Sequence, residues 1–118
     1  MIPLEEIRRA RERIGVDVLR TPLVPFGADG RIWLKLECLQ PVGSFKLRGA
    51  LSAVRAVAAA ELAPGVVTAS AGNMAQGVAW AAREAGVAAR VIAPADAPRA
   101  KLDRVEALGA EVVPVTHE

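Results

Sequence analysis

Apolar and polar positions alternate with two different periods along the chain, and the change of period separates helices from strands. Residues 3–14 carry acidic side chains before basic ones, which suits the helix dipole and predicts a first helix. Residues 21–25 are bracketed by prolines and predict a short extended piece, followed by a turn at 27–30. Residues 31–37 (RIWLKLE) alternate polar and apolar side chains, so a strand is expected there.

The rest of the chain switches repeatedly between the helical and the strand period. A helix is expected from about residue 44 to residue 62, because Leu47, Leu51 and Val54 recur at helical spacing. Apolar runs and turn residues predict the remaining elements, which are strands at 66–69, 88–93 and 111–115 and helices at 73–85 and 96–108.

The order of these elements predicts the fold class. Strands and helices alternate from residue 31 onward, which favours an α/β fold with a mostly parallel sheet and right-handed crossovers. Asp96 is expected to cap the last helix, and Pro114 indicates an edge strand or a strand end. Ligands of such sheets bind beyond the carboxyl ends of the strands, where helix N-termini also point. That rule selects two candidate sites, at residues 41–46 and 69–74.

Composition narrows the classes of protein that fit this pattern. Of the 118 residues, 53% are apolar and only 3% are aromatic, so we expect a core of Ala, Val, Leu and Ile in one domain or in part of a larger one. The net charge of +2 comes from 15 basic and 13 acidic residues that are mixed along the chain. No basic cluster or aromatic platform is present in the sequence, so binding to nucleic acid is not expected.

The single cysteine, the single histidine and the lack of a long apolar run exclude further classes of protein. Cys38 is the single cysteine, so no internal disulfide can form, which suits a reducing cytoplasm. No apolar run approaches about 18 residues, and neither a membrane span nor a signal peptide is expected. His117 is the single histidine, and a metal site of clustered ligands is not expected.

Lys46 is the candidate reactive residue of the first site, PVGSFKLRGA. It falls in the first turn of the expected helix, where helical spacing aligns it with Ala50, Ala53 and Val57, whereas Arg48 falls on a polar line that points more to water. A lysine amine near a helix N-terminus and an apolar face can attack carbonyl groups and form a Schiff base. The alternative is a lysine whose stem covers apolar surface while its ammonium group reaches water.

The second candidate site, VVTASAGNMAQG, leads from a strand through Gly72 into a helix. Free backbone N–H groups at Asn73, Met74 and the residue after them would form an anion site at the helix N-terminus. Ser70 and Asn73 add side-chain donors, so a carboxylate or a phenolate oxygen would fit. The alternative is that Asn73 only caps the helix.

The two segments together resemble one known family. LKLECLQPVGSFKLRGA at 34–50 resembles the lysine segment of the fold-type-II pyridoxal-phosphate enzymes (the tryptophan synthase β-like superfamily), and SAGNMAQGVA at 70–79 resembles their asparagine loop. The form S-F-K-x-R-G-A is most similar to the serine/threonine dehydratase and serine racemase branch. The resemblance implies a three-layer α/β fold, a mostly parallel sheet with helices on both faces. It also implies a cytoplasmic, homo-oligomeric enzyme of amino-acid metabolism that uses pyridoxal 5'-phosphate.

The resemblance assigns cofactor-binding roles to three residues. Lys46 would carry the cofactor as a Schiff base and would later act as the base on the substrate's α-proton. Phe45 would pack beside the cofactor. Asn73 would hydrogen-bond the cofactor's ring oxygen.

The resemblance also assigns substrate-binding roles. Ser70 and the backbone of Gly72, Asn73 and Met74 would bind the carboxylate of serine or threonine, and Ser70 could exchange a proton on the face of the cofactor opposite Lys46. The implied reaction is that of a lyase. Loss of the α-proton and of the β-hydroxyl removes water and leaves an aminoacrylate or its methyl homologue, which water then hydrolyses to a 2-oxo acid and ammonia.

The sequence departs from the family pattern at three points. Met74 stands where most relatives have His, Val42 stands where many have Thr, and the family's later glycine-rich phosphate loop is missing although the chain has ten glycines. We therefore expect residues 1–118 to be the N-terminal part of a longer dehydratase, the start of its large domain plus its small domain. The alternatives are an amino-acid racemase of the same family and a non-catalytic, truncated α/β module.

Overall fold

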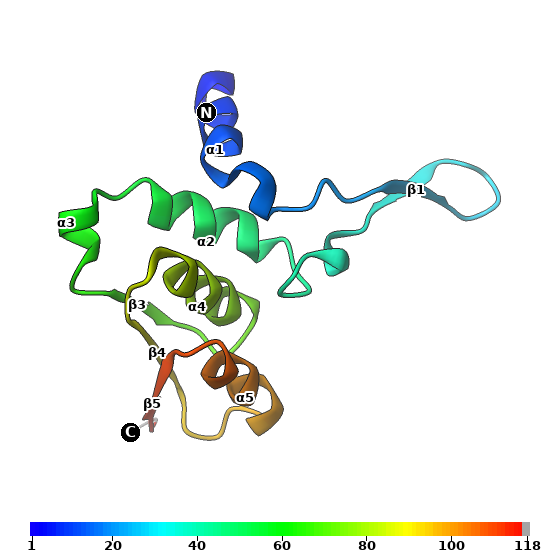
Figure 1. Ribbon diagram of the computed structural model, residues 1–118. Coiled ribbons are helices and arrows are strands. Elements are labelled where there is room, and N and C mark those ends of the chain that lie inside the picture. The colour runs from blue at the N-terminus through cyan, green and yellow to red at the C-terminus, as the bar shows by residue number, and fades with distance from the viewer. Residues whose placement is uncertain (117–118) are drawn as a thin grey trace.

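A three-stranded parallel sheet organises the C-terminal half of the chain (Figure 1). In the computed structural model, which describes residues 1–116, the strand order is β3-β4-β5. The elements of this half are β3 (Val66–Ala69), α4 (Asn73–Ala85), β4 (Ala89–Pro94), α5 (Arg99–Ala107) and β5 (Glu111–Val115). The predicted α/β class with a parallel sheet is thus confirmed, and β5 with Pro114 lies at a sheet edge as expected. The expectation for His117 lies outside the described residues.

Small residues let α4 lie between the sheet and α2 (Lys46–Arg55). Ala75 and Ala79 are fully buried and pack with Val91 of β4. On the side toward α2, a Cβ added at Gly77 would lie 3.2 Å from the Cβ of Ala50 and 3.3 Å from the backbone carbonyl of Lys46. The alanine-rich composition therefore produces close layers of helix on helix and helix on sheet.

The strand predicted at 31–37 is present, but its place in the parallel sheet was predicted wrongly. β2 (Ile32–Lys35) pairs antiparallel with β1 (Leu23–Phe26) and forms a separate hairpin that extends away from the helices (Figure 1). Gly27 and Gly30 adopt φ angles of 84° and 65°, which turn the chain back on itself. The strand therefore pairs with the segment just before it.

The single helix predicted at 44–62 is two helices, α2 and α3 (Ala59–Leu62). Between them Ala58 is extended, with φ −63° and ψ 145°. The buried face of α2 ends at Val54, and Val57 is exposed. Continuing α2 would bury no further side chains, and in proteins a helix depends on burying one face.

Asp96 does not cap α5, contrary to the prediction. Pro98 occupies the N-cap position in an extended conformation, and no side chain among the described residues caps this helix end. Because a proline disfavours helical geometry in the residue before it, the helix cannot begin earlier than Pro98. Asp96 is left exposed in the preceding turn.

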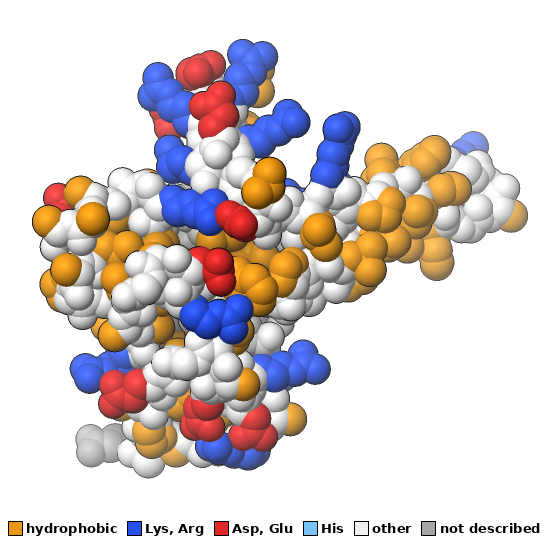
Figure 2. Space-filling model, in the orientation of Figure 1, with side chains coloured by type: hydrophobic (Ala, Val, Ile, Leu, Met, Phe, Trp, Pro, Cys, Tyr) orange, Lys and Arg blue, Asp and Glu red, His pale blue; other side chains and the backbone are white. Residues whose placement is uncertain are grey.

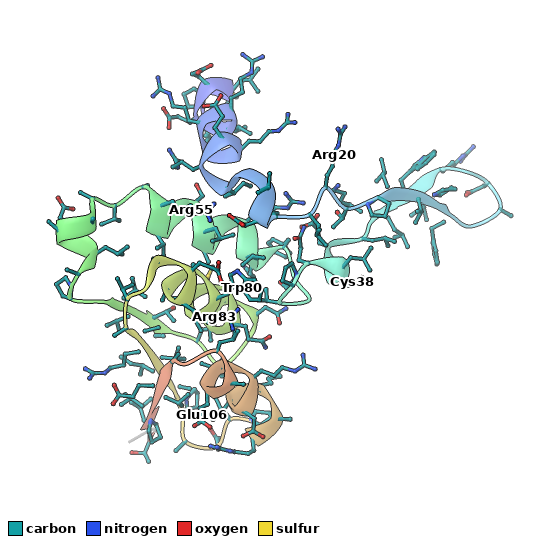
Figure 3. All side chains as sticks on the ribbon, viewed as in Figure 1. Arg20, Cys38, Arg55, Trp80, Arg83 and Glu106 are labelled. Atoms are coloured by element: carbon teal, nitrogen blue, oxygen red, sulfur yellow. The ribbon has the colours of Figure 1, made fainter. Side chains whose placement is uncertain are left out.

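Helix α1 (Leu4–Ile14) and the 3-10 helix η1 (Gly15–Asp17) lie against α2. Ile14 is the buried residue of α1. Arg55 of α2 donates to the carbonyl oxygens of Arg13 and Ile14 at 2.9 and 3.0 Å and pairs with Asp17 (Figure 3). No helix within residues 1–116 has the length and apolar character needed to cross a membrane.

Candidate active site

A tight loop delivers Lys46 to the first turn of α2. The 3-10 helix η2 (Glu37–Leu39) precedes this loop. Gly43, with φ 70°, donates its N–H to the carbonyl oxygen of Gln40 at 2.6 Å. The hydroxyl oxygen of buried Ser44 then accepts the N–H of Lys46 at 3.2 Å. The loop thus ends in a hydrogen bond that satisfies one of the free donors at the helix start.

The side chain of Lys46 lies at the border between core and solvent. Lys46 is half-buried, and its Nζ lies 4.9 Å from the ring centroid of Phe45, which is 58% exposed. Three residues were expected to share a helix face with Lys46. Of these, Ala50 is buried, whereas Ala53 and Val57 are exposed. A lysine amine in this position can reach a ligand from outside while its stem stays against the helix.

Arg48, which the sequence placed on a polar line that points more to water, is 34% exposed at its side chain but is also bound to other protein groups. Its guanidinium group donates from Nε and Nη2 to the two carboxylate oxygens of Glu37, both at 2.7 Å. It also donates to the carbonyl oxygen of Leu19 at 2.9 Å. Hydrogen bonds from Arg48 and then from Thr21 lower the pKa of Glu37 from 4.5 to about 2, against the opposing effect of burial. The pair is held by a bidentate geometry that a solvated arginine would lack.

The second candidate segment joins β3 to α4. The hydroxyl oxygen of Ser70 accepts the N–H of Gly72 at 3.2 Å, so the Gly72 amide already has a partner inside the loop. Gly72 is the N-cap residue, Asn73 is the first residue of α4, and no described side chain caps this helix end. The alternative that Asn73 only caps the helix is therefore wrong. Asn73 is exposed, and the first N–H groups of α4 have no acceptor within the helix.

Packing brings the two candidate segments together. Gly77, one helical turn after Asn73, lies against the backbone of Lys46. Met74 is half-buried and packs on the core cluster of α2 that includes Leu47 and Val54. Met74 therefore fills apolar space with its side chain, and only its backbone is left to serve a ligand.

The sequence did not indicate a cavity of about 410 Å³ beside the N-terminus of α4. Gly72, Asn73 and Gln76 line it from α4, and α5 contributes Lys101 and Arg104. Two basic side chains and a helix N-terminus give this cavity a positive potential that suits an anionic group. No spacing rule links α4 to α5, so only the folded chain shows that these residues meet.

The residues present fit the reactive end of an aldehyde cofactor. Lys46 offers a primary amine, Phe45 offers an exposed aromatic ring beside that amine, and Asn73 offers an exposed amide donor at a helix N-terminus. The fold thus places a lysine at the start of α2 and uncapped backbone N–H groups at the start of α4.

Comparison with known proteins identifies the family. Residues 14–118 match the family described as "Pyridoxal-phosphate dependent enzyme", and the chain belongs to this family. The L-threonine ammonia-lyase of Thermotoga maritima is 42% identical over an alignment of 118 positions, which covers 96% of this chain and 29% of that protein. The predicted membership in the fold-type-II enzymes, in the serine/threonine dehydratase and serine racemase branch, is confirmed.

Solved structures agree with this assignment. The threonine deaminase from T.th. is 43% identical with a TM-score of 0.86, over 96% of this chain and 37% of that one. The serine racemase from Dictyostelium discoideum is 34% identical with a TM-score of 0.91, over 98% of this chain and 40% of that one. The chain thus spans less than half the length of each of these relatives.

Proposed function

We propose that the chain is the N-terminal part of a pyridoxal-phosphate-dependent ammonia-lyase that converts threonine or serine to a 2-oxo acid and ammonia. It would supply the start of the large domain and the small domain of that enzyme. The observation that carries the proposal is the half-buried Lys46 at the start of α2, whose backbone lies against Gly77 of α4. The relatives named threonine ammonia-lyase and threonine deaminase support the choice of reaction.

Lys46, Phe45 and Asn73 would hold the cofactor. When bound, pyridoxal phosphate supplies an electron sink that stabilises negative charge at the substrate's α-carbon. Lys46 would hold the cofactor through Nζ, and the same nitrogen would take the α-proton, since a neutral lysine amine is a base. The Phe45 ring would pack beside the cofactor, and the side-chain amide of Asn73 would donate to its ring oxygen.

Ser70 and the start of α4 would orient the substrate. The Ser70 oxygen accepts the Gly72 N–H, which leaves the Ser70 O–H free to donate to a carboxylate. The N–H groups of Asn73 and Met74 would complete this anion site, because the first turn of a helix leaves them without acceptors. Gly72 would then act mainly by orienting Ser70, and Ser70 could also hold a proton on the face of the cofactor opposite Lys46.

Amino-acid racemisation is the second candidate function. It is favoured by the serine racemase from Dictyostelium discoideum, whose TM-score of 0.91 exceeds that of the threonine deaminase. Proton removal on one face and return on the other would need both Lys46 and Ser70, whereas elimination needs one base. The products therefore separate the two candidates.

The test uses the whole enzyme of which this chain would be the N-terminal part. It is loaded with pyridoxal phosphate and given L-threonine or L-serine. We expect formation of a 2-oxo acid and ammonia, and we expect Lys46→Ala to reduce the rate by at least ~10²-fold because general-base catalysis is lost. A Lys46→Ala variant that keeps its rate would exclude the assigned role. A D-amino acid as the main product would favour racemisation.

We also propose a cytoplasmic, homo-oligomeric enzyme. Cys38 is a free, exposed thiol, which suits a reducing compartment. The hairpin β1-β2 carries exposed apolar side chains, among them Phe26 at 56% and Trp33 at 55% exposure. Surfaces of this kind are usually covered by more protein. Sedimentation velocity of the full chain tests the oligomeric state.

A further inference from the structure

The carboxylate of Glu37 connects three segments that are separate in the sequence. It accepts two hydrogen bonds of 2.7 Å from Arg48 in the first turn of α2. It accepts a third, of 2.6 Å, from the Thr21 hydroxyl, which precedes the hairpin. A fourth, of 3.3 Å, comes from the Gln40 side-chain amide at the start of the lysine loop. None of these four side chains has a part in the chemistry proposed above.

The network around Glu37 is closed and partly buried: the side chain of Glu37 is 16% exposed and that of Arg48 is 34% exposed. Gln40 is 3% exposed, and its amide also donates to the carbonyl oxygen of Leu19 at 2.9 Å and accepts the Leu19 N–H at 3.1 Å. Thr21 is 4% exposed. Each of these polar groups has a protein partner, and a network whose members are all satisfied holds them in one arrangement. The lowered pKa of Glu37 keeps its carboxylate charged at neutral pH.

The network holds the chain on both sides of Lys46. Arg48 is two residues after Lys46 in the same helical turn, and Gln40 opens the loop that ends at Lys46. Both ends of the segment 40–48 are therefore tied to Glu37. A bidentate arginine–carboxylate pair fixes orientation as well as distance, which a lysine in place of the arginine could not do.

We propose that Arg48 and Glu37 are positioning residues for Lys46, which hold the first turn of α2 so that the lysine amine meets the cofactor's aldehyde carbon. This inference rests on the proposed function of Lys46. Misplacement of a reacting group by about 1 Å can cost ~10²-fold in rate, so a loosened first turn should be visible in the reaction of Lys46 itself.

The test compares substitutions of two arginines of α2, each made in the same whole protein that is used to test the proposed function. Arg48→Lys keeps the charge but removes the bidentate geometry. Arg55→Lys is the matched control, because Arg55 also pairs with a carboxylate and donates to two carbonyl oxygens, but at the other end of α2 (Figure 3). Each protein is mixed with pyridoxal phosphate, sampled with borohydride over time and mapped for label on Lys46. Thermal unfolding reports the loss of stability separately.

We expect Arg48→Lys to slow labelling of Lys46 by about 10-fold or more, since orientation is lost, and Arg55→Lys to stay within about two-fold of the wild type. Equal rates in Arg48→Lys and the wild type would overturn the inference alone. A wild type with no label on Lys46 would overturn the proposed function and the inference together. If Arg48→Lys does not fold, Glu37→Gln replaces it with the same expected slowing, and an unchanged rate in Glu37→Gln overturns the inference.

Discussion

Two charged side chains near Lys46 are paired, while Lys46 itself has no charged partner among the described residues. Glu37 accepts hydrogen bonds from Arg48, Thr21 and Gln40, so its negative charge is stabilised well beyond that of a solvated carboxylate. The Nζ of Lys46 lies instead beside the exposed ring of Phe45. The proposed role of Lys46 needs an amine that no salt bridge holds in place, and the described residues offer none.

The Glu37 pair predicts how stability depends on pH. The pKa of Glu37 falls from 4.5 to about 2 on folding, so its contribution is complete above 4.5 and is lost as the pH falls through about 2. We expect the free energy of unfolding of Glu37→Gln to decline less than that of the wild type across this range. Urea unfolding at a series of pH values measures this decline in the free energy of unfolding. Glu111→Gln is the control, since the Glu111–Arg90 pair is exposed on both sides. Equal declines in Glu37→Gln and the wild type would contradict the account.

Among single residues, the sequence indicated some positions of the candidate site and missed others that support it. Lys46 and Asn73 could be selected because each begins a helix after a loop, and that signal is local. Glu37 and Arg48 are 11 residues apart in different elements, and no repeating pattern predicts their meeting. For the same reason Arg48 was expected to face water.

Among the elements, the packing of α4 on α2 decides the geometry of the site. Gly77 allows this approach, since its missing side chain leaves room for Ala50 and the Lys46 carbonyl. The neighbours of Gly77 are a helix backbone and a buried methyl group, neither of which can move aside easily. The distance between Lys46 and the start of α4 is therefore set by a glycine.

Gly77→Ala is predicted to destabilise the protein. Overpacking costs about 1–3 kcal/mol, which exceeds the ~0.5–1 kcal/mol that alanine gains over glycine in a helix. Gly49→Ala in α2 is the control, because an added Cβ there meets nothing within 4 Å among the described residues, and it should stabilise by about 0.5–1 kcal/mol. Chemical denaturation of both variants measures the difference. A stabilised Gly77→Ala would show that α2 is free to shift.

Elements with strong local signals were predicted with accurate bounds. The strands at 66–69 and 111–115 and the helix at 73–85 coincide with β3, β5 and α4, because glycine and proline mark their ends. The helix at 44–62 was too long, because spacing alone does not show where burial ends. The strand at 31–37 was given the wrong partner, because pairing depends on the turn before it.

At the scale of the whole molecule, the hairpin is the least covered part. Figure 2 shows apolar side chains gathered along the arm that β1 and β2 form, away from the helices. The exposed apolar side chains of this arm are Leu23, Phe26, Ile32, Trp33 and Leu34. The net charge of +2 is too small to keep such surfaces apart by repulsion.

We predict that the 118-residue chain self-associates through this arm. Replacing both Phe26 and Trp33 by Ser should weaken association by at least about 10-fold, since covering one such side chain contributes ~1.5–3 kcal/mol. Val16→Ser is the control, because Val16 is 95% exposed but lies outside the arm. Sedimentation velocity over a range of concentrations measures the change. A wild-type chain that stays monomeric throughout would contradict the prediction.

Mapping of borohydride-fixed pyridoxal phosphate shows directly whether Lys46 carries the cofactor. The chain has three lysines, and Lys35 and Lys101 are exposed, so they serve as internal controls. We expect a visible absorbance band whose reduction leaves the label on Lys46 and not on the other two lysines. Label spread over all three lysines, or absent from Lys46, would contradict it.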